Sequence, residues 1–128
     1  MEDETTVKGR TNLLRKACMN GDFELANYCV FLGADLSDNW FIENSSYYGY
    51  YDIVELLLKN GANPYGHGST IACSAARGHY RVVRLLKVYI RNHKINKILN
   101  LIIIFKYLLD LEPVCISDIK IKNKLKIN

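Results

Sequence analysis

The clearest pattern of apolar and polar positions lies in residues 51–65, which read YDIVELLLKNGANPY. Four aliphatic residues recur there at the spacing of one α-helix face: Ile53, Val54, Leu57 and Leu58. Gly61 stands where this spacing fails, and glycine readily takes the positive φ that ends many helices. Pro64 then prevents the helix from continuing. The pattern predicts a short amphipathic helix that ends near Gly61.

The same pattern occurs three times along the chain. Residues 23–37 (FELANYCVFLGADLS) and 80–87 (YRVVRLLK) align with it without gaps. Each copy follows a glycine (Gly21, Gly49 or Gly78), and these glycines are 28 and 29 residues apart. A second, earlier helix that carries small residues is expected before each glycine, over residues 12–20, 40–48 and 69–77. Such a period is typical of solenoids, whose units cover one another's apolar faces. The sequence therefore predicts an all-α fold of stacked helix-turn-helix units.

These repeats resemble a known family. The segments IVELLLKNGAN (53–63), GHYRVVRLL (78–86) and GAD (33–35) are similar to the second half of an ankyrin repeat, and the resemblance covers residues 11–90. It implies an ankyrin-type α-solenoid. The family's T-P-L-H motif is replaced by NLLR (12–15), WFIE (40–43) and STIA (69–72), so its histidine is absent each time. The periods are also shorter than the family's length of about 33 residues. We therefore expect shortened or absent β-hairpin fingers. Short repeats in a chain rich in Ile, Asn, Lys and Tyr also resemble those of large DNA viruses.

The repeats divide the chain into six expected parts. Residues 1–10 form a flexible acidic N-terminus, three ankyrin-like repeats occupy 11–37, 38–65 and 66–90, a degenerate fourth repeat or C-terminal capping helices occupy 91–113, and a basic tail occupies 114–128. Within the fifth part, residues 98–111 (ILNLIIIFKYLLDL) predict an apolar helix. A membrane span needs about 20 apolar residues, and three polar ones interrupt this run. A capping helix, a membrane contact and a decayed C-terminus remain three interpretations of it.

Charge is distributed unevenly in a chain of 128 residues with a formal net charge of +4. Residues 1–65 hold five Lys and Arg against ten Asp and Glu, whereas residues 66–128 hold twelve against three. Two interpretations stay open: a solvated outer face with pairs such as Asp52 with Arg81 and Glu55 with Arg84, or a basic end that attracts an acidic partner. The lysines that alternate with Ile and Leu in residues 119–128 suit an inert tail, a polyanion-binding tail or a localisation signal.

The residues that most often carry chemistry show no catalytic pattern. The four cysteines, Cys18, Cys29, Cys73 and Cys115, lack zinc or redox spacing, and we expect those in the repeats to pack as small apolar residues in a reducing compartment. His79 follows Gly78 and is expected to have a structural role. The chain is expected to be no enzyme and to need no cofactor or metal. Residues 1–6 resemble no signal peptide and no transmembrane span is expected, so the expected location is intracellular and cytoplasmic, or the host cell cytoplasm for a viral protein.

A candidate partner-binding stripe follows from the resemblance. In ankyrin proteins the two positions before the mid-repeat glycine face the concave groove, and here they are Met19, Asn20, Tyr47, Tyr48, Ala76 and Arg77. Tyr47 and Tyr48 are either partner anchors or core residues, while Trp40 and Tyr50 suit the core better. The expected function is a non-enzymatic protein–protein interaction module that binds another protein through the concave face. The alternative is a polyanion binder, of nucleic acid or anionic membrane, acting through the basic C-terminal half and tail. No small-molecule substrate is expected.

Overall fold

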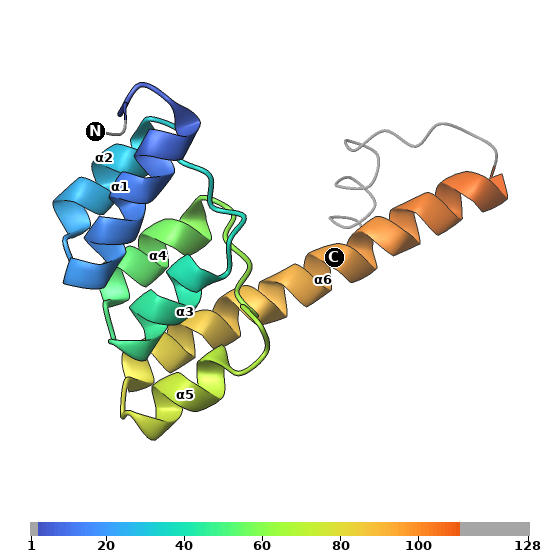
Figure 1. The fold of residues 1–128 in the computed structure, drawn as a ribbon. Helices are drawn as coiled ribbons and strands as arrows, with labels where there is room; N and C mark the ends of the chain where they lie inside the picture. Colours follow the sequence, from blue (N-terminus) through green and yellow to red (C-terminus); the bar gives the residue numbers. More distant parts are fainter. Residues whose placement is uncertain (1–2, 111–128) are drawn as a thin grey trace. The chain divides into compact units, whose positions relative to one another are not determined.

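The computed structural model describes residues 3–110, and this part of the chain contains six helices and no strand (Figure 1). In chain order they are α1 (Val7–Asn20), α2 (Phe23–Phe31), α3 (Trp40–Tyr47), α4 (Tyr51–Lys59), α5 (Thr70–Ala76) and α6 (Tyr80–Asp110). The chain divides into two compact units between Arg91 and Asn92. The expected all-α fold is confirmed.

The first unit is a stack of helical hairpins. Helices α1 and α2 pack together, as do α3 and α4. Helix α3 also lies between α1 and α5 in one layer, while α2 packs on α4 in the other (Figure 1). The first turns of α6 complete the second layer, since Val82 and Leu86 belong to the same buried cluster as the residues of α4. The predicted stacking of helix-turn-helix units is therefore confirmed.

Local signals place the helix ends. The side chain of Thr6 accepts a hydrogen bond from the Gly9 amide at 3.0 Å, which satisfies a free amide of the first turn of α1. Asp22 does the same for Leu25 at the start of α2, at 3.1 Å. At the other end of α4, Gly61 takes a φ of 93°, and the Ala62 amide donates to the Leu57 carbonyl at 3.0 Å. The helix stop predicted at Gly61 is confirmed.

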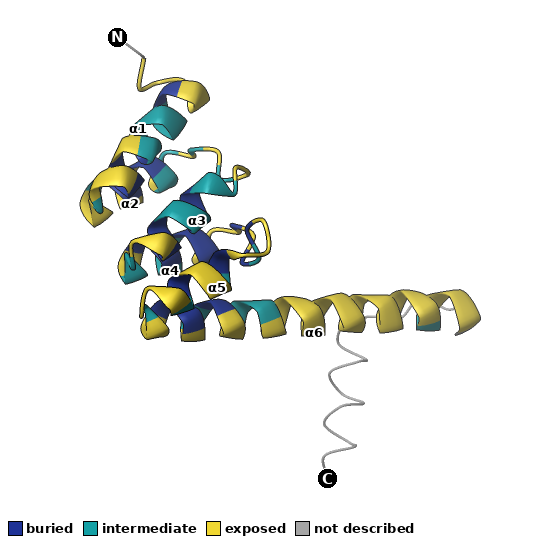
Figure 2. Ribbon diagram, turned by 60° about the horizontal axis from the view of Figure 1, so that its bottom comes forward, coloured by how far each residue is buried: buried dark blue, intermediate teal, exposed yellow. Residues whose placement is uncertain are grey.

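The core lies between the two layers of the first unit (Figure 2). Two of the aligned columns of the repeats are buried throughout. They are Ala26, Val54 and Val83, and Cys29, Leu57 and Leu86. A third aligned position is filled by Tyr28, Leu56 and Leu85, and here Tyr28 is exposed while the other two are partly buried. Leu25 is likewise less buried than its aligned residues Ile53 and Val82, so burial follows the repeat except at two positions of the first hairpin.

The second helix of the third repeat does not stop where its counterparts do. The spacing of apolar residues separates residues 80–87 from a helix over 98–111, but α6 runs without a break from Tyr80 to Asp110. Ile90 occupies the position aligned with Gly33 and Gly61, and no glycine or proline follows before residue 113. Nothing in the sequence therefore ends the helix at that point. The basic tail at 114–128, the end of part 91–113 and residues 1–2 lie outside the described residues.

The expected ion pairs between α4 and α6 are wrong. Glu55 pairs with Lys59 in its own helix, with 2.5 Å between Oε1 and Nζ, and this carboxylate raises the pKa of Lys59. Arg81 lies over the ring of Tyr51, 4.3 Å from its centroid. Glu55 and Arg81 therefore have partners other than those the aligned positions suggested, and the neighbouring helices α4 and α6 are joined by apolar contacts and by a cation–π contact.

Candidate functional site

An exposed aromatic cluster lies where α3 ends. Tyr47 and Tyr48 are 41% and 49% exposed, and their rings meet edge to face with centroids 5.0 Å apart. The ring of Tyr48 also stacks on that of Tyr50 at 5.8 Å. Arg77, just after α5, donates a hydrogen bond to the Tyr47 hydroxyl at 3.0 Å and places its guanidinium 4.1 Å from the centre of that ring. Two adjacent repeats therefore hold one another's surface side chains in place.

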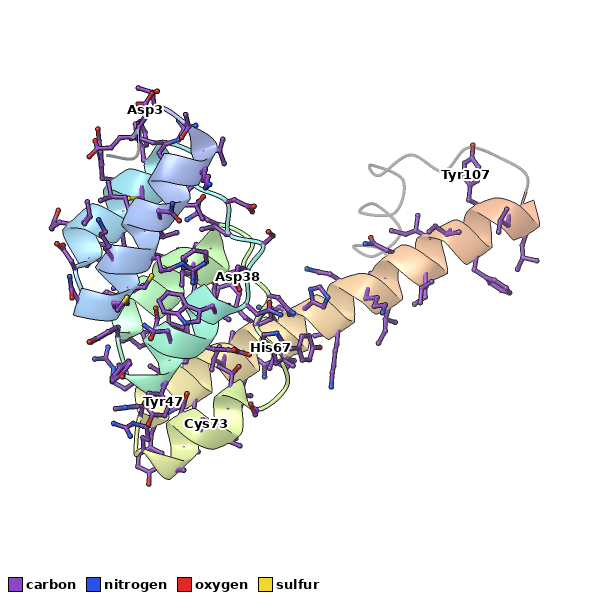
Figure 3. All side chains as sticks on the ribbon, viewed as in Figure 1. Asp3, Asp38, Tyr47, His67, Cys73 and Tyr107 are labelled. Atoms are coloured by element: carbon purple, nitrogen blue, oxygen red, sulfur yellow. The ribbon has the colours of Figure 1, made fainter. Side chains whose placement is uncertain are left out.

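A shallow groove adjoins this cluster. It has a volume of about 300 Å³ and runs between α3 and the start of α5. The side chains that line it are Trp40, Glu43, Asn44, Tyr47, Tyr48, Ser69, Thr70 and Cys73. Tyr47 and Cys73 mark the two helices on either side of it in Figure 3. The lining combines aromatic surface with hydroxyl and amide groups, a composition that suits side chains of another protein.

All six residues of the predicted stripe lie at the surface. Met19 and Asn20 end α1, Tyr47 and Tyr48 end α3, and Ala76 and Arg77 end α5, and each of them is exposed. The structure brings Tyr47, Tyr48 and Arg77 into direct contact. Met19, Asn20 and Ala76 are related to these three only because they occupy equivalent positions in their repeats. Binding by this stripe remains a prediction.

Trp40 and Tyr50 behave mainly as packing residues. Both are partly buried against the core. The guanidinium of Arg15 lies 4.6 Å from the Trp40 ring, so this tryptophan also joins the first two repeats. Tyr50 covers Gly21 of the preceding repeat so closely that a Cβ there would lie 2.7 Å from its ring. Their expected assignment to the core agrees with these contacts, although Trp40 also lines the groove.

Two polar links lie at the positions where the T-P-L-H motif would carry a histidine, and sequence reasoning did not identify them. Arg15 pairs with Asp38 at 3.0 Å, and the amide of Trp40 together with this guanidinium lowers the pKa of Asp38. One repeat later, Glu43 accepts hydrogen bonds from the amide of His67 at 2.6 Å and contacts its ring at Nδ1. Arg15 aligns with Glu43, and Asp38 aligns with His67. In the sequence, the signal for these links is a reversal of residue type between repeats: a basic residue aligns with an acidic one at the first position, and an acidic residue aligns with a histidine at the second.

Side chains of one first helix also donate hydrogen bonds to backbone carbonyl groups of the preceding first helix. Asn44 donates its amide to the Cys18 carbonyl at 2.9 Å, and Ser74 donates its hydroxyl to the Ser46 carbonyl at 3.1 Å. Cys18 and Ser46 are aligned, and both lie in the last turn of a first helix, where carbonyl groups lack partners within the helix. These bonds fix the spacing of the layer that carries the groove.

The cysteines differ in their surroundings. Cys18 and Cys29 are buried free thiols, and burial raises the pKa of Cys18 to about 11 and also raises that of Cys29. Cys73 is exposed beside the groove, so the expectation that it packs as an apolar residue is wrong. Cys115 lies outside the described residues. Within residues 3–110, no cluster of three or more His, Cys, Asp or Glu is placed to hold a metal ion.

No helix among the described residues has the length and apolar character that crossing a membrane requires. That finding includes α6, whose apolar stretch is interrupted by Asn100 and Lys106.

Comparison with known protein families gives a match. A family model described as "Ankyrin repeat" matches residues 45–66, which extend from the last turn of α3 through α4 to the connection before α5. No curated protein and no solved structure matched the chain. Ankyrin repeats generally mediate binding to other proteins, and the family is typically non-enzymatic. The match falls on the hairpin where the apolar period and the glycine stop are clearest. Residues 45–66 are therefore similar to an ankyrin repeat, and the stacked helical hairpins of the first unit are consistent with ankyrin-type repeats.

Proposed function

We propose that this chain is a non-enzymatic interaction module that binds another protein through the face formed by the ends of α1, α3 and α5. The single observation that carries the proposal is the pair of exposed tyrosines beside the groove, held by Arg77 of the next repeat. Aromatic and arginine side chains that are ordered before binding lose little conformational entropy when a partner covers them, so they are frequent anchors of interfaces. No catalytic turnover and no small-molecule substrate form part of this proposal.

The partner would contact Tyr47 and Tyr48 directly and place a side chain into the groove between α3 and α5. Trp40 lines the groove from α3, and Thr70 and Cys73 line it from α5 of the next repeat. Met19 and Asn20 extend the same stripe by one repeat. Because Asn44 and Ser74 tie the first helices together, a partner would meet a surface that is already arranged.

A matched pair of double variants tests this proposal. The bound protein is first recovered with the tagged parent chain from its native source and purified, and its affinity is then measured by calorimetry. Tyr47→Ala/Tyr48→Ala should weaken binding at least about tenfold, because two central aromatic anchors are lost. Tyr28→Ala/Phe31→Ala removes two exposed aromatics from α2, in the other layer, and should leave the affinity within about twofold of the parent.

Thermal unfolding of the same proteins distinguishes loss of contact from loss of folding. Both double variants should melt within a few degrees of the parent, because all four side chains are exposed. A Tyr47→Ala/Tyr48→Ala protein that melts far below the control would assign the tyrosines to the core. Equal affinities of the two double variants for the partner would reject the concave face as the binding surface.

Binding of a polyanion is a second candidate function, and one observation favours it. Arg84, Lys87 and Arg91 recur along α6 at the spacing of one helix face, and all three are exposed. Arg81 and Arg84 also line a shallow groove of about 280 Å³ beside Tyr51. Nucleic acid or anionic lipid would meet a row of positive charge there, whose attraction falls as salt is added. The basic tail of the original expectation lies outside the described residues.

A triple variant with a matched control separates this candidate from the first. Binding to a labelled single-stranded oligonucleotide is measured as a function of salt for Arg84→Ala/Lys87→Ala/Arg91→Ala and for Lys8→Ala/Lys16→Ala/Lys59→Ala. Both remove three exposed positive charges, but only the first removes them from one helix face. If α6 binds polyanions, the first variant alone should weaken binding and flatten its salt dependence. Equal losses would indicate attraction to net charge without a site.

A further inference from the structure

The second unit contains apolar surface that nothing among the described residues covers. From Ile95 to Leu109 almost every aliphatic or aromatic side chain of α6 is exposed, as the yellow ribbon of that part of the helix shows (Figure 2). The polar positions in the same stretch are few. A helix that is apolar on most of its circumference is ordinarily buried against other helices or in a bilayer. A surface of this size therefore marks a contact site.

Five of these side chains form a regular row. Ile95, Ile98, Ile102, Phe105 and Leu109 follow one another at alternating steps of three and four residues, and they are between 47% and 67% exposed. This is the spacing at which one α-helix packs lengthwise against another, each side chain filling a gap on the partner helix. We refer to these five residues as the α6 seam. Leu99, Leu101 and Leu108 flank it and widen the apolar strip.

We infer that the α6 seam packs against the α6 seam of a second copy of this chain, so that the protein associates with itself through this helix. A second copy presents the same row of branched and aromatic side chains, and a two-fold axis between the helices lets each side chain meet its counterpart. Eight side chains that are each about half exposed offer on the order of 100 Å² apiece, or about 800 Å² per copy, the usual contribution of each partner to a stable interface. The seam is thus large enough for a specific dimer.

The charge beside the seam predicts how salt affects this self-association. Lys94 lies beside the seam and is positive, so two copies repel one another weakly at this position. Added salt screens this repulsion and leaves the apolar contact intact or stronger. Self-association through the seam should therefore strengthen with salt, in contrast to polyanion binding, which should weaken.

Two double variants of the full chain test the inference by sedimentation velocity over a range of concentrations. Ile98→Glu/Ile102→Glu places two carboxylates in the α6 seam. Ile104→Glu/Tyr107→Glu places two on the opposite side of the same helix, at side chains of similar exposure. The seam variant should raise the dissociation constant of self-association at least about tenfold, whereas the control should change it about threefold or less. Circular dichroism checks that both keep the helix content of the parent.

Each other outcome overturns the inference. A parent chain that stays monomeric at every concentration would mean that another occupant, such as residues 111–128 of its own chain, covers the surface. Equal weakening by the two variants would reject the seam. A monomeric chain that binds phosphatidylcholine vesicles, and loses this binding in the seam variant, would assign the surface to lipid. None of these results bears on binding at Tyr47 and Tyr48, because those residues take no part in the seam.

Discussion

Single residues show how closely the repeats are fitted together. Gly49 has a φ of 74°, and a Cβ at this position would lie 2.4 Å from Nδ1 of His79. Gly21 meets the ring of Tyr50 in the same way. In each case the residue after one mid-repeat glycine rests on the mid-repeat glycine of the preceding repeat. The glycines therefore serve two purposes, a left-handed backbone and a place for the neighbouring ring.

Gly78 supplies a control that separates these two purposes. It has a φ of 80°, but a Cβ there would have no neighbour within 4 Å. Gly78→Ala should therefore lose only the backbone term of about 1–2 kcal/mol, whereas Gly49→Ala should lose a further contribution of about 1–3 kcal/mol because His79 must move. Urea unfolding of both variants measures the difference. Equal losses would show that the ring shifts at no cost.

Leu57 tests the core at the same scale. It is fully buried between the layers, so Leu57→Ala should lower the free energy of unfolding by about 2–5 kcal/mol through the cavity it leaves. Leu56, the residue before it, is only partly buried, and Leu56→Ala should lower the free energy of unfolding clearly less. Chemical denaturation of the two variants gives the comparison. Similar losses would contradict the assignment of Leu57 to the shared core of the stack.

At the scale of helices, α1 and α3 are each linked to the connection that leads into the next repeat. Arg15 on α1 reaches Asp38, and Glu43 on α3 reaches the backbone and ring of His67. The two links have opposite polarity but equivalent positions. Together with the bonds from Asn44 and Ser74 to neighbouring carbonyls, they fix the first-helix layer where the family's T-P-L-H motif is missing.

The Asp38 link should make a small contribution to stability that depends on pH. Since its folded pKa is lowered, the unfolded state binds the proton more tightly, and the contribution is present above the ordinary aspartate pKa of 3.8 and is lost as the pH falls through the folded value. Asp38→Asn should therefore be less stable than the parent at pH 7, by at most about 1 kcal/mol for so exposed a pair. Urea unfolding at pH 7 and pH 3 should show the gap closing. A gap of the same size at both would contradict the link.

The sequence predicted the helices of the repeats wherever the signals for them were local. The apolar period and Gly61 placed α4, and repetition placed its partners. The start of α1 at Val7 was missed because residues 7–12 are mostly polar and lack an apolar period, although Thr6 caps the helix. The links from Arg15 and Glu43 join residues that are 23 and 24 positions apart. They and the contact of Arg77 with Tyr47 depend on how repeats stack, which no single period encodes.

At the scale of the whole chain, the two units differ in how much they bury. The first contains the shared core, while large apolar side chains of the second, within residues 92–109, are exposed. Amides of α4 should therefore exchange with solvent hydrogen only on global unfolding, whereas those of residues 95–109 should exchange faster at dilutions where the chain is monomeric. Hydrogen exchange followed by mass spectrometry measures both. Equal protection in dilute solution would show that this helix is covered within one chain.

The difference in burial between the two units follows from the residue at position 90, an isoleucine. After each of the first two hairpins a glycine with positive φ follows the second helix, and a connection then leads to the next hairpin, which begins at Trp40 or at Thr70. An isoleucine at the third such point gives no signal for a helix end, so α6 continues for about five further turns. With isoleucine in place of glycine, the chain has a continuous helix where the other repeats have a return loop. That helix carries an exposed aliphatic surface, which favours association with another apolar surface.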